Sequence, residues 1–186
     1  MSFNKIKNGL SFARSHIALI IPAAAVFVVL CVFVVRVFFI NIVVVNGVSM
    51  EPTLLQGERW IMSRTDRSCD AGDIIVYRPS EDSKNLSVSR VVAVAGDSVY
   101  IDFSTGYLYI NGERRDESYV SGPIKTGGRY ISSLIDSGNY GMSEPFVIEQ
   151  GKVFVLGDNR SNSRDSREFG QISLELVKGT VTRKVK

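Results

Sequence analysis

Residues 107–112 read YLYING, and this stretch decides the fold class of the C-terminal part of the chain. Its aromatic and branched residues favour an extended strand. The pair Asn111-Gly112 that follows is typical of a tight hairpin turn, because both central residues of such a turn need positive φ angles. The sequence therefore predicts a β-hairpin here.

The same pattern continues on both sides of this hairpin. Of the 16 glycines, 15 lie after residue 45, between short runs such as DIIVY, SRVVAVA, EPFVIE and KVFVL. No stretch in this part shows convincing helical periodicity, and residues 121–145 are expected to be an irregular insertion or mobile loop. We expect residues 41–186 to form a mainly antiparallel β domain, of folded sheets or a partly open barrel.

An apolar segment precedes this domain. Residues 17–35 are 19 consecutive apolar residues, long enough as a helix to cross the roughly 30 Å of a hydrocarbon core. A cleavable secretory signal is the alternative, but its apolar core is normally about 7 to 15 residues long. We therefore expect a single N-terminal transmembrane helix over residues 17–40.

The basic residues around this helix predict its orientation. Lys5, Lys7 and Arg14 precede it, while Arg36 near its end is the last basic residue before Arg59. Because basic residues flank the cytoplasmic side, residues 1–16 are expected in the cytoplasm and residues 41–186 outside the cell membrane. The lipid bilayer is thus one expected partner.

Composition excludes several classes of function. After the four basic residues up to Arg36 are subtracted from 22, residues 41–186 hold 18 basic against 19 acidic residues, so no basic face for nucleic acid is expected. One histidine, His16, and two cysteines, Cys31 and Cys69, make a metal site or a disulfide framework implausible. No cofactor and no metal are expected.

Two polar segments are candidates for chemistry. Ser49 lies in GVSMEPTLLQGE, residues 47–58, close to the predicted membrane surface, although turn serines commonly bond only their own backbone. A Ser-His-Asp triad is excluded, because His16 is expected on the other side of the membrane. A base for Ser49 would have to be a lysine with a lowered pKa.

The second segment is GDNRSNSRDSREFG, residues 157–170. Charged runs usually face water, which is the simpler interpretation. If the segment is buried, its polar groups must form hydrogen bonds and ion pairs with one another or with nearby residues. Asp158 or Asp165 would then pair with Arg90, Arg160 or Arg167.

Four motifs follow the apolar segment in a fixed order: GVSMEPTL, GDIIVY, SRVVAVAGDSV and GDNRSNSRDSREFG. In this order they resemble bacterial type I signal peptidases, and the likeness covers most of residues 15–175. The resemblance implies a membrane-anchored serine endopeptidase with a β-rich catalytic domain that cleaves signal peptides from exported preproteins.

The resemblance also implies roles for individual residues. Ser49 matches the nucleophile, and Ser163 matches the serine that orients the general base. Other matched positions hold the site together by hydrogen bonds and ion pairs: Arg90, Asp158, Asp165 and Arg167. Val48, Met50 and Val91 are candidates for contact with the substrate, because they lie next to these motifs; ordinary core packing is the alternative, above all for Val91.

The sequence departs from the family at the general base, where relatives carry a lysine and this chain has Ser89. A hydroxyl has almost no tendency to hold a proton near neutral pH. Three explanations are open. Lys84 reaches the site from a loop, although five extended residues would separate it by roughly 16 Å; or Ser89 replaces the base in a slow or inactive protein; or a water held by Ser89 and Ser163 acts weakly.

Two classes of function remain. The first is a signal peptidase that transfers the acyl group of the scissile bond to Ser49. The second is a catalytically inactive relative that acts as a binding or assembly factor for secreted or surface proteins, and Ser89 is the feature that favours it.

Overall fold

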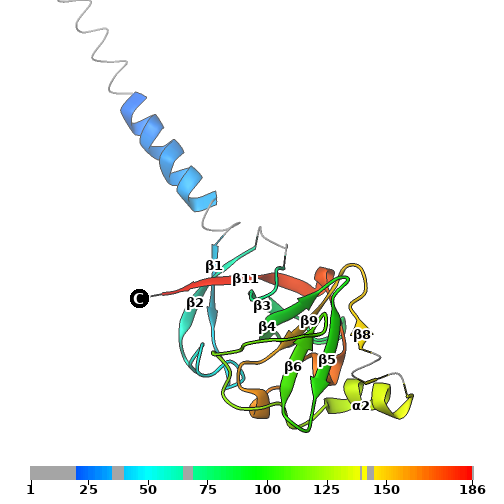
Figure 1. The fold of residues 1–186 in the computed structure, drawn as a ribbon. Coiled ribbons are helices and arrows are strands. Elements are labelled where there is room, and N and C mark those ends of the chain that lie inside the picture. Colours follow the sequence, from blue (N-terminus) through cyan, green and yellow to red (C-terminus); the bar gives the residue numbers. More distant parts are fainter. Residues whose placement is uncertain (1–19, 35–39, 65–68, 139, 142–144, 186) are drawn as a thin grey trace, which may run out of the picture. The chain divides into compact units, whose positions relative to one another are not determined.

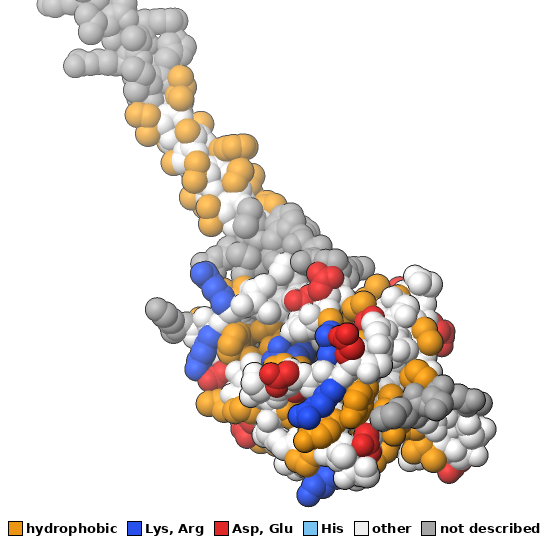
Figure 2. All heavy atoms as spheres, in the orientation of Figure 1, with side chains coloured by type: hydrophobic (Ala, Val, Ile, Leu, Met, Phe, Trp, Pro, Cys, Tyr) orange, Lys and Arg blue, Asp and Glu red, His pale blue; other side chains and the backbone are white. Residues whose placement is uncertain are grey.

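The computed structural model describes residues 20–34, 40–64, 69–138, 140–141 and 145–185, and it divides the chain into two compact units, residues 1–40 and 41–186 (Figure 1). In the first unit, residues 20–34 are helical and expose their apolar side chains, which appear as orange spheres in Figure 2. No helix within the described ranges is both long and apolar enough to cross a membrane. The ends of the predicted span, residues 17–19 and 35–39, and the predicted cytoplasmic segment lie outside those ranges.

The second unit contains a seven-stranded sheet in the order β1-β2-β11-β3-β4-β9-β10. The pairs whose register is known are all antiparallel. The predicted antiparallel β domain is thus confirmed, although Ile40, the predicted last residue of the span, already belongs to β1. The strands of this sheet are β1 (Ile40–Val44), β2 (Arg59–Ser63), β3 (Ile74–Tyr77), β4 (Ser87–Val94), β9 (Lys152–Leu156), β10 (Ile172–Ser173) and β11 (Val177–Lys184).

A second, four-stranded sheet has the order β7-β6-β5-β8. Its strands are β5 (Ser98–Asp102), β6 (Tyr107–Ile110), β7 (Glu113–Arg114) and β8 (Phe146–Val147). The predicted hairpin joins β6 to β7, and Asn111 and Gly112 have φ angles of 55° and 80°. The local turn signal therefore predicted both the turn and its backbone conformation.

Short helices complete the second unit: α2 (Gly128–Asp136), α3 (Ser166–Phe169), and the 3₁₀ turns η1 (Arg160–Asn162) and η2 (Leu174–Leu176). The expectation that residues 121–145 are irregular is wrong for α2. Helix α2 lies inside the segment that was expected to be irregular, and it buries Ile131 while Tyr130 and Leu134 pack beside it. Figure 1 shows α2 at one end of this unit and β1, β2 and β11 at the other.

The cores of this unit lie on the sheets. The largest cluster draws on both sheets and α2, with Val99, Leu108, Ile131 and Phe154 among its members. A second cluster includes Ile75, Tyr77, Val91 and Val155 on the β3-β4-β9 part of the large sheet. These packed strands hold in place the backbone next to the two polar segments, residues 47–58 and 157–170.

Candidate active site

Ser49 lies in the turn that follows β1 and is half-buried. Its carbonyl oxygen accepts a hydrogen bond of 3.0 Å from the backbone N–H of Asn159, and the side-chain amide of Asn159 donates to the carbonyl of Val48 at 3.1 Å. Two of the four sequence motifs are thus tied together, although about a hundred residues separate them.

The reactive groups of Ser49 have no competing partner. Among the described residues, neither its hydroxyl nor its backbone N–H takes part in a hydrogen bond. A free hydroxyl next to a free N–H is the arrangement in which a serine attacks a carbonyl and the N–H then stabilises the negative oxygen that forms.

Gly157 lies where Ser49 and Ser163 approach each other. In the β4-β9 pairing Arg90 is opposite Leu156 and Val91 is opposite Val155, so the next step of this register places Ser89 opposite Gly157. A Cβ atom on Gly157 would lie 2.6 Å from the carbonyl oxygen of Ser49 and 2.7 Å from Oγ of Ser163. The structure therefore brings the backbone of Ser49 and the side chain of Ser163 together around a residue that has no room for a side chain, and Ser89 lies on the neighbouring strand β4.

Ser163 is held by a buried ion pair. Its hydroxyl donates to Oδ2 of Asp165, and Nη2 of Arg167 donates to Oγ of Ser163 at 2.8 Å. Arg167 also donates to both carboxylate oxygens of Asp165, through Nε and Nη2, each at 2.8 Å. Asp165 is completely buried and further accepts the N–H of Gly157 at 3.0 Å, so the pair is fully hydrogen-bonded and fixes the position of Ser163.

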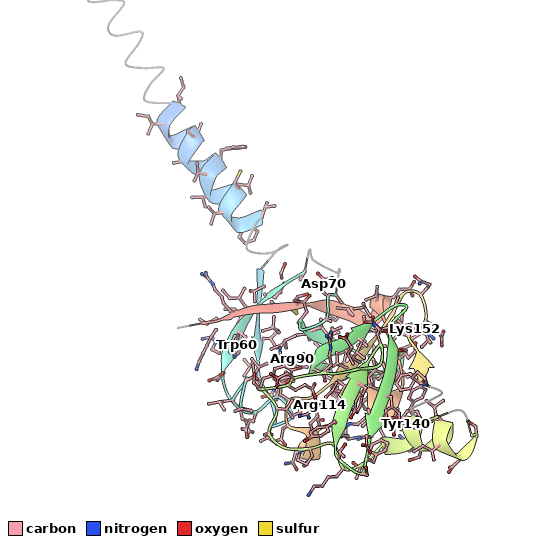
Figure 3. All side chains as sticks on the ribbon, in the orientation of Figure 1. Trp60, Asp70, Arg90, Arg114, Tyr140 and Lys152 are labelled. Atoms are coloured by element: carbon pink, nitrogen blue, oxygen red, sulfur yellow. The ribbon has the colours of Figure 1, made fainter. Side chains whose placement is uncertain are left out.

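Arg90 and Asp158 form a second ion pair. Arg90 donates from Nε and Nη2 to the buried carboxylate of Asp158, at 2.9 and 2.7 Å, and from Nη1 to the carbonyl of Gly72 at 2.8 Å. Burial lowers the pKa of Arg90, but the hydrogen bond and charge of Asp158 more than offset it and raise that pKa overall. Figure 3 labels Arg90 in the middle of the β unit.

Thr53 completes this ion pair, since its hydroxyl donates to Oδ2 of Asp158. Sequence reasoning did not single out Thr53, although it lies four residues after Ser49 in the same motif. Arg160, predicted as a partner of Asp158 or Asp165, pairs instead with Glu117, to which it donates two hydrogen bonds of 2.9 and 2.6 Å. That part of the prediction is wrong, because Glu117 lies closer to the buried guanidinium than either aspartate.

Ser89 is almost completely buried, and its hydroxyl lies 3.3 Å from the hydroxyl of Tyr77. Burial raises the pKa of the Tyr77 hydroxyl well above its ordinary value, and the negative charge of Asp165 raises it further. Tyr77 is therefore a neutral phenol at physiological pH and does not act as a base. It is the second residue that sequence reasoning missed, because its partner depends on the register of β3 against β4.

A groove of about 670 Å³ runs beside Ser49. Val48 and Met50 both line it, but Val48 is 38% exposed whereas Met50 is only 1% exposed. Val91 does not line this groove and is completely buried with Ile75 and Tyr77, so core packing accounts for it.

Lys84 also lines the groove that contains Ser49. It belongs to the loop before β4, which begins only at Ser87, so the assumption that an extended strand carries it away from the site is wrong. Lys84 is exposed and makes no ion pair or hydrogen bond within the described part of the chain. The described residues also contain no group of three His, Cys, Asp or Glu side chains that could hold a metal ion.

A family profile described as "Signal peptidase, peptidase S26" matches residues 17–185. This chain belongs to the signal peptidase family. The resemblance inferred from the four motifs is therefore confirmed.

Individual members of the signal peptidase family are similar to this chain over most of its length. Signal peptidase IB of Staphylococcus aureus is 35% identical over 169 residues, which cover 88% of this chain and 85% of that protein. Signal peptidase I of Bacillus licheniformis is 36% identical over 162 residues, covering 84% and 82%. The crystal structure of a signal peptidase I from Enterococcus faecalis is 27% identical, covers 61% of this chain and 96% of that one, and has a TM-score of 0.43.

Proposed function

We propose that this chain is a membrane-anchored serine endopeptidase that cleaves signal peptides from exported preproteins, with Ser49 as its nucleophile. The observation that carries the proposal is the meeting of Ser49 and Ser163 at Gly157, beside a groove large enough for several residues of a peptide. Membership of the signal peptidase family supports the reaction type.

In this proposal the Ser49 hydroxyl attacks the carbonyl carbon of the scissile bond. A bond forms between Oγ and that carbon, the N–H of Ser49 donates to the developing oxyanion, and the C–N bond breaks as the leaving amine takes up a proton. Water then hydrolyses the ester and releases the peptide. Ser163, fixed by Asp165 and Arg167, orients the group that accepts the Ser49 proton.

The proton acceptor is the weak point of this site. At the position of the family's lysine the chain has Ser89, and we propose that a water held by Ser89 and Ser163 takes its place. Losing a positioned base lowers a rate by about 10²- to 10⁴-fold. Slow cleavage is therefore expected from the sequence as it stands.

We further propose that residues 17–40 anchor the protein in the cell membrane, with residues 1–16 in the cytoplasm and the β unit outside. The support is the apolar run of residues 17–35 and the basic residues before it. Signal peptides and the lipid bilayer are then the partners of the β unit.

A second function is favoured by the contact between Ser89 and Tyr77. The two hydroxyls place neutral groups where the family has its basic lysine. Such a site suits a chain that binds exported or surface proteins without cutting them. In that case the groove beside Ser49 would hold a peptide that is released intact.

A cleavage assay separates these functions. The full chain in detergent micelles is incubated with a preprotein, next to its Ser89→Lys, Ser49→Ala and Ser89→Lys/Ser49→Ala variants. The peptidase proposal predicts slow cleavage by the unchanged chain, faster cleavage by Ser89→Lys, and none by either variant that lacks Ser49. Cleavage that persists without Ser49 would overturn it, and binding without any cleavage, even with lysine at residue 89, would favour the second function.

A further inference from the structure

The groove beside Ser49 has an unbalanced charge. Its lining includes two basic side chains, Lys84 and Arg164, and no acidic one. They come from different parts of the chain, since Lys84 belongs to the loop before β4 and Arg164 to the segment between η1 and α3. Two cations in a lining that contains no anion favour a positive potential near these residues.

The charges of both residues are available to a ligand. Lys84 is exposed and has no ionic or hydrogen-bonding partner among the described residues. The side chain of Arg164 is 73% exposed and reaches Glu168 only at 3.7 Å, with its guanidinium 5.4 Å above the ring of Phe169. So loose a surface pair leaves most of the Arg164 charge to interact with a bound carboxylate.

The rest of the lining mixes apolar side chains with uncharged polar ones, among them Asn46, Asn85 and Asn162. Val44, Val48 and Leu86 border the groove and are 48%, 38% and 55% exposed. A ligand that matches this lining has apolar side chains in an extended backbone and at least one carboxylate, which describes a short acidic peptide segment.

We propose that Lys84 and Arg164 make this groove select peptides that carry Asp or Glu beside their apolar residues. The inference rests on the proposed function, because it assumes that the groove receives the peptide, and it adds a preference that the reaction itself does not require. Each exposed cation is expected to strengthen binding of an acidic peptide by about two- to five-fold. The preference weakens at high salt, since ions screen exposed charges over about 8 Å at physiological ionic strength.

Two labelled peptides test the proposal. They share one apolar sequence with a signal-peptide cleavage site and differ only in two Asp residues that are replaced by Asn, so shape is kept and charge is lost. Fluorescence anisotropy with the full-length Ser49→Ala chain in detergent micelles gives the dissociation constant of each without cleavage. We expect the Asp peptide to bind about four- to twenty-five-fold more tightly at low salt, as two cations each contribute.

Matched variants assign the effect to its residues. Lys84→Gln and Arg164→Gln are each expected to remove part of the preference, whereas Arg164→Lys keeps the charge and most of the preference. Lys125→Gln removes an exposed lysine outside the groove and is expected to change nothing.

Three outcomes overturn the proposal, and they can be distinguished. Equal binding of both peptides would refute the charge preference while the proposed function stands. No binding of either peptide would refute the preference together with the proposed function, because the groove would then receive no peptide. An acidic preference that Lys125→Gln reduces as much as Lys84→Gln would show that overall charge, not the groove, is responsible, and would also overturn the inference.

Discussion

Oγ of Ser163 lies 2.7 Å from the position that a Cβ atom would take on Gly157, closer than two such atoms approach without moving. The carbonyl oxygen of Ser49 lies 2.6 Å from the same position. Gly157 is therefore required by contact rather than by its backbone conformation, since its φ angle is not in the left-handed region. The absence of a side chain at residue 157, directly after β9, lets the backbone pass close to both serines.

Gly157→Ala tests this close approach. We expect it to destabilise the fold by about 1–3 kcal/mol, the usual effect of overpacking, and to move Ser49 or Ser163. Introduced together with Ser89→Lys, it should slow cleavage by about 10²-fold, because a small misplacement of reacting groups has an effect of this size. Gly141→Ala is the control, since a Cβ there has open space. Equal effects of the two alanines on stability and cleavage would contradict the packing described here.

The ion pair between Arg90 and Asp158 should contribute strongly to the stability of the fold. Asp158 is completely buried and accepts from Arg90 and Thr53. Asp158→Asn leaves the Arg90 charge without its partner and is expected to lower the free energy of unfolding by about 3–5 kcal/mol. The measurement is urea unfolding followed by tryptophan fluorescence.

Glu149→Gln is the matched control for that variant. Its partner Lys152 is on the surface, and exposed pairs contribute less than about 1 kcal/mol. If Asp158→Asn were no more destabilising than Glu149→Gln, the Arg90-Asp158 pair would not be a buried structural element.

Tyr77 should limit the gain in cleavage rate that Ser89→Lys brings. In Ser89→Lys the side chain no longer offers a hydroxyl to Tyr77, and a buried phenol without a partner destabilises the fold by about 1–3 kcal/mol. Adding Tyr77→Phe removes that unpaired group and opens room for the lysine. The double variant is therefore expected to be more stable than Ser89→Lys and to cleave the preprotein faster.

Tyr140→Phe is the comparison for this experiment. It also removes a phenol, but that hydroxyl bonds the backbone of Ile101, and Figure 3 labels Tyr140 beside α2, away from Arg90. Tyr140→Phe should not rescue Ser89→Lys. If both phenylalanines rescued it equally, a specific contact between residues 77 and 89 would not be the cause.

Buried tyrosines also predict an alkaline loss of stability. Burial raises the pKa of Tyr119 to about 12, with the charge of Glu117 adding to the effect, and it raises the pKa values of Tyr77 and Tyr140 as well. Above the ordinary tyrosine pKa of about 10 the unfolded chain loses these protons while the folded chain keeps them. Stability is thus unaffected below about pH 10 and falls as the pH rises further.

Tyr77→Phe isolates one of these groups. In urea unfolding at several pH values above about 10, its stability should fall by about 1.4 kcal/mol less per pH unit than that of the unchanged chain, which corresponds to one proton. Parallel slopes for the two proteins would show that Tyr77 ionises alike in the folded and unfolded states.

Local signals in the sequence predicted the parts of this structure that depend on near neighbours. The turn is recognised from two neighbouring residues, Asn111 and Gly112. The motif around Ser49 is recognised from only a few more. Helix α2 was missed because it is only nine residues long and glycines flank it, at Gly127 and Gly138. Its apolar residues do recur at helical spacing, but over little more than two turns.

Contacts over long distances in the chain were harder to predict. Arg160 and Glu117 are 43 residues apart, and nothing near either residue distinguishes this partner from the aspartates close to Arg160. The contact of Tyr77 with Ser89 depends on how β3 and β4 align, which the run DIIVY does not reveal. The expectation that an extended strand carries Lys84 away from the site failed because the start of β4, at Ser87, was not known.

The most direct test of Ser49 as the nucleophile identifies the serine hydroxyl that reacts with an electrophile. A fluorophosphonate that labels activated serines is applied to the full chain and to its Ser89→Lys/Tyr77→Phe variant, and peptide mapping by mass spectrometry locates the adduct. We predict an adduct on Ser49, formed faster in the double variant and absent after Ser49→Ala. An adduct on Ser163 or on a serine outside the groove, or labelling that survives Ser49→Ala, would contradict the assignment of the nucleophile.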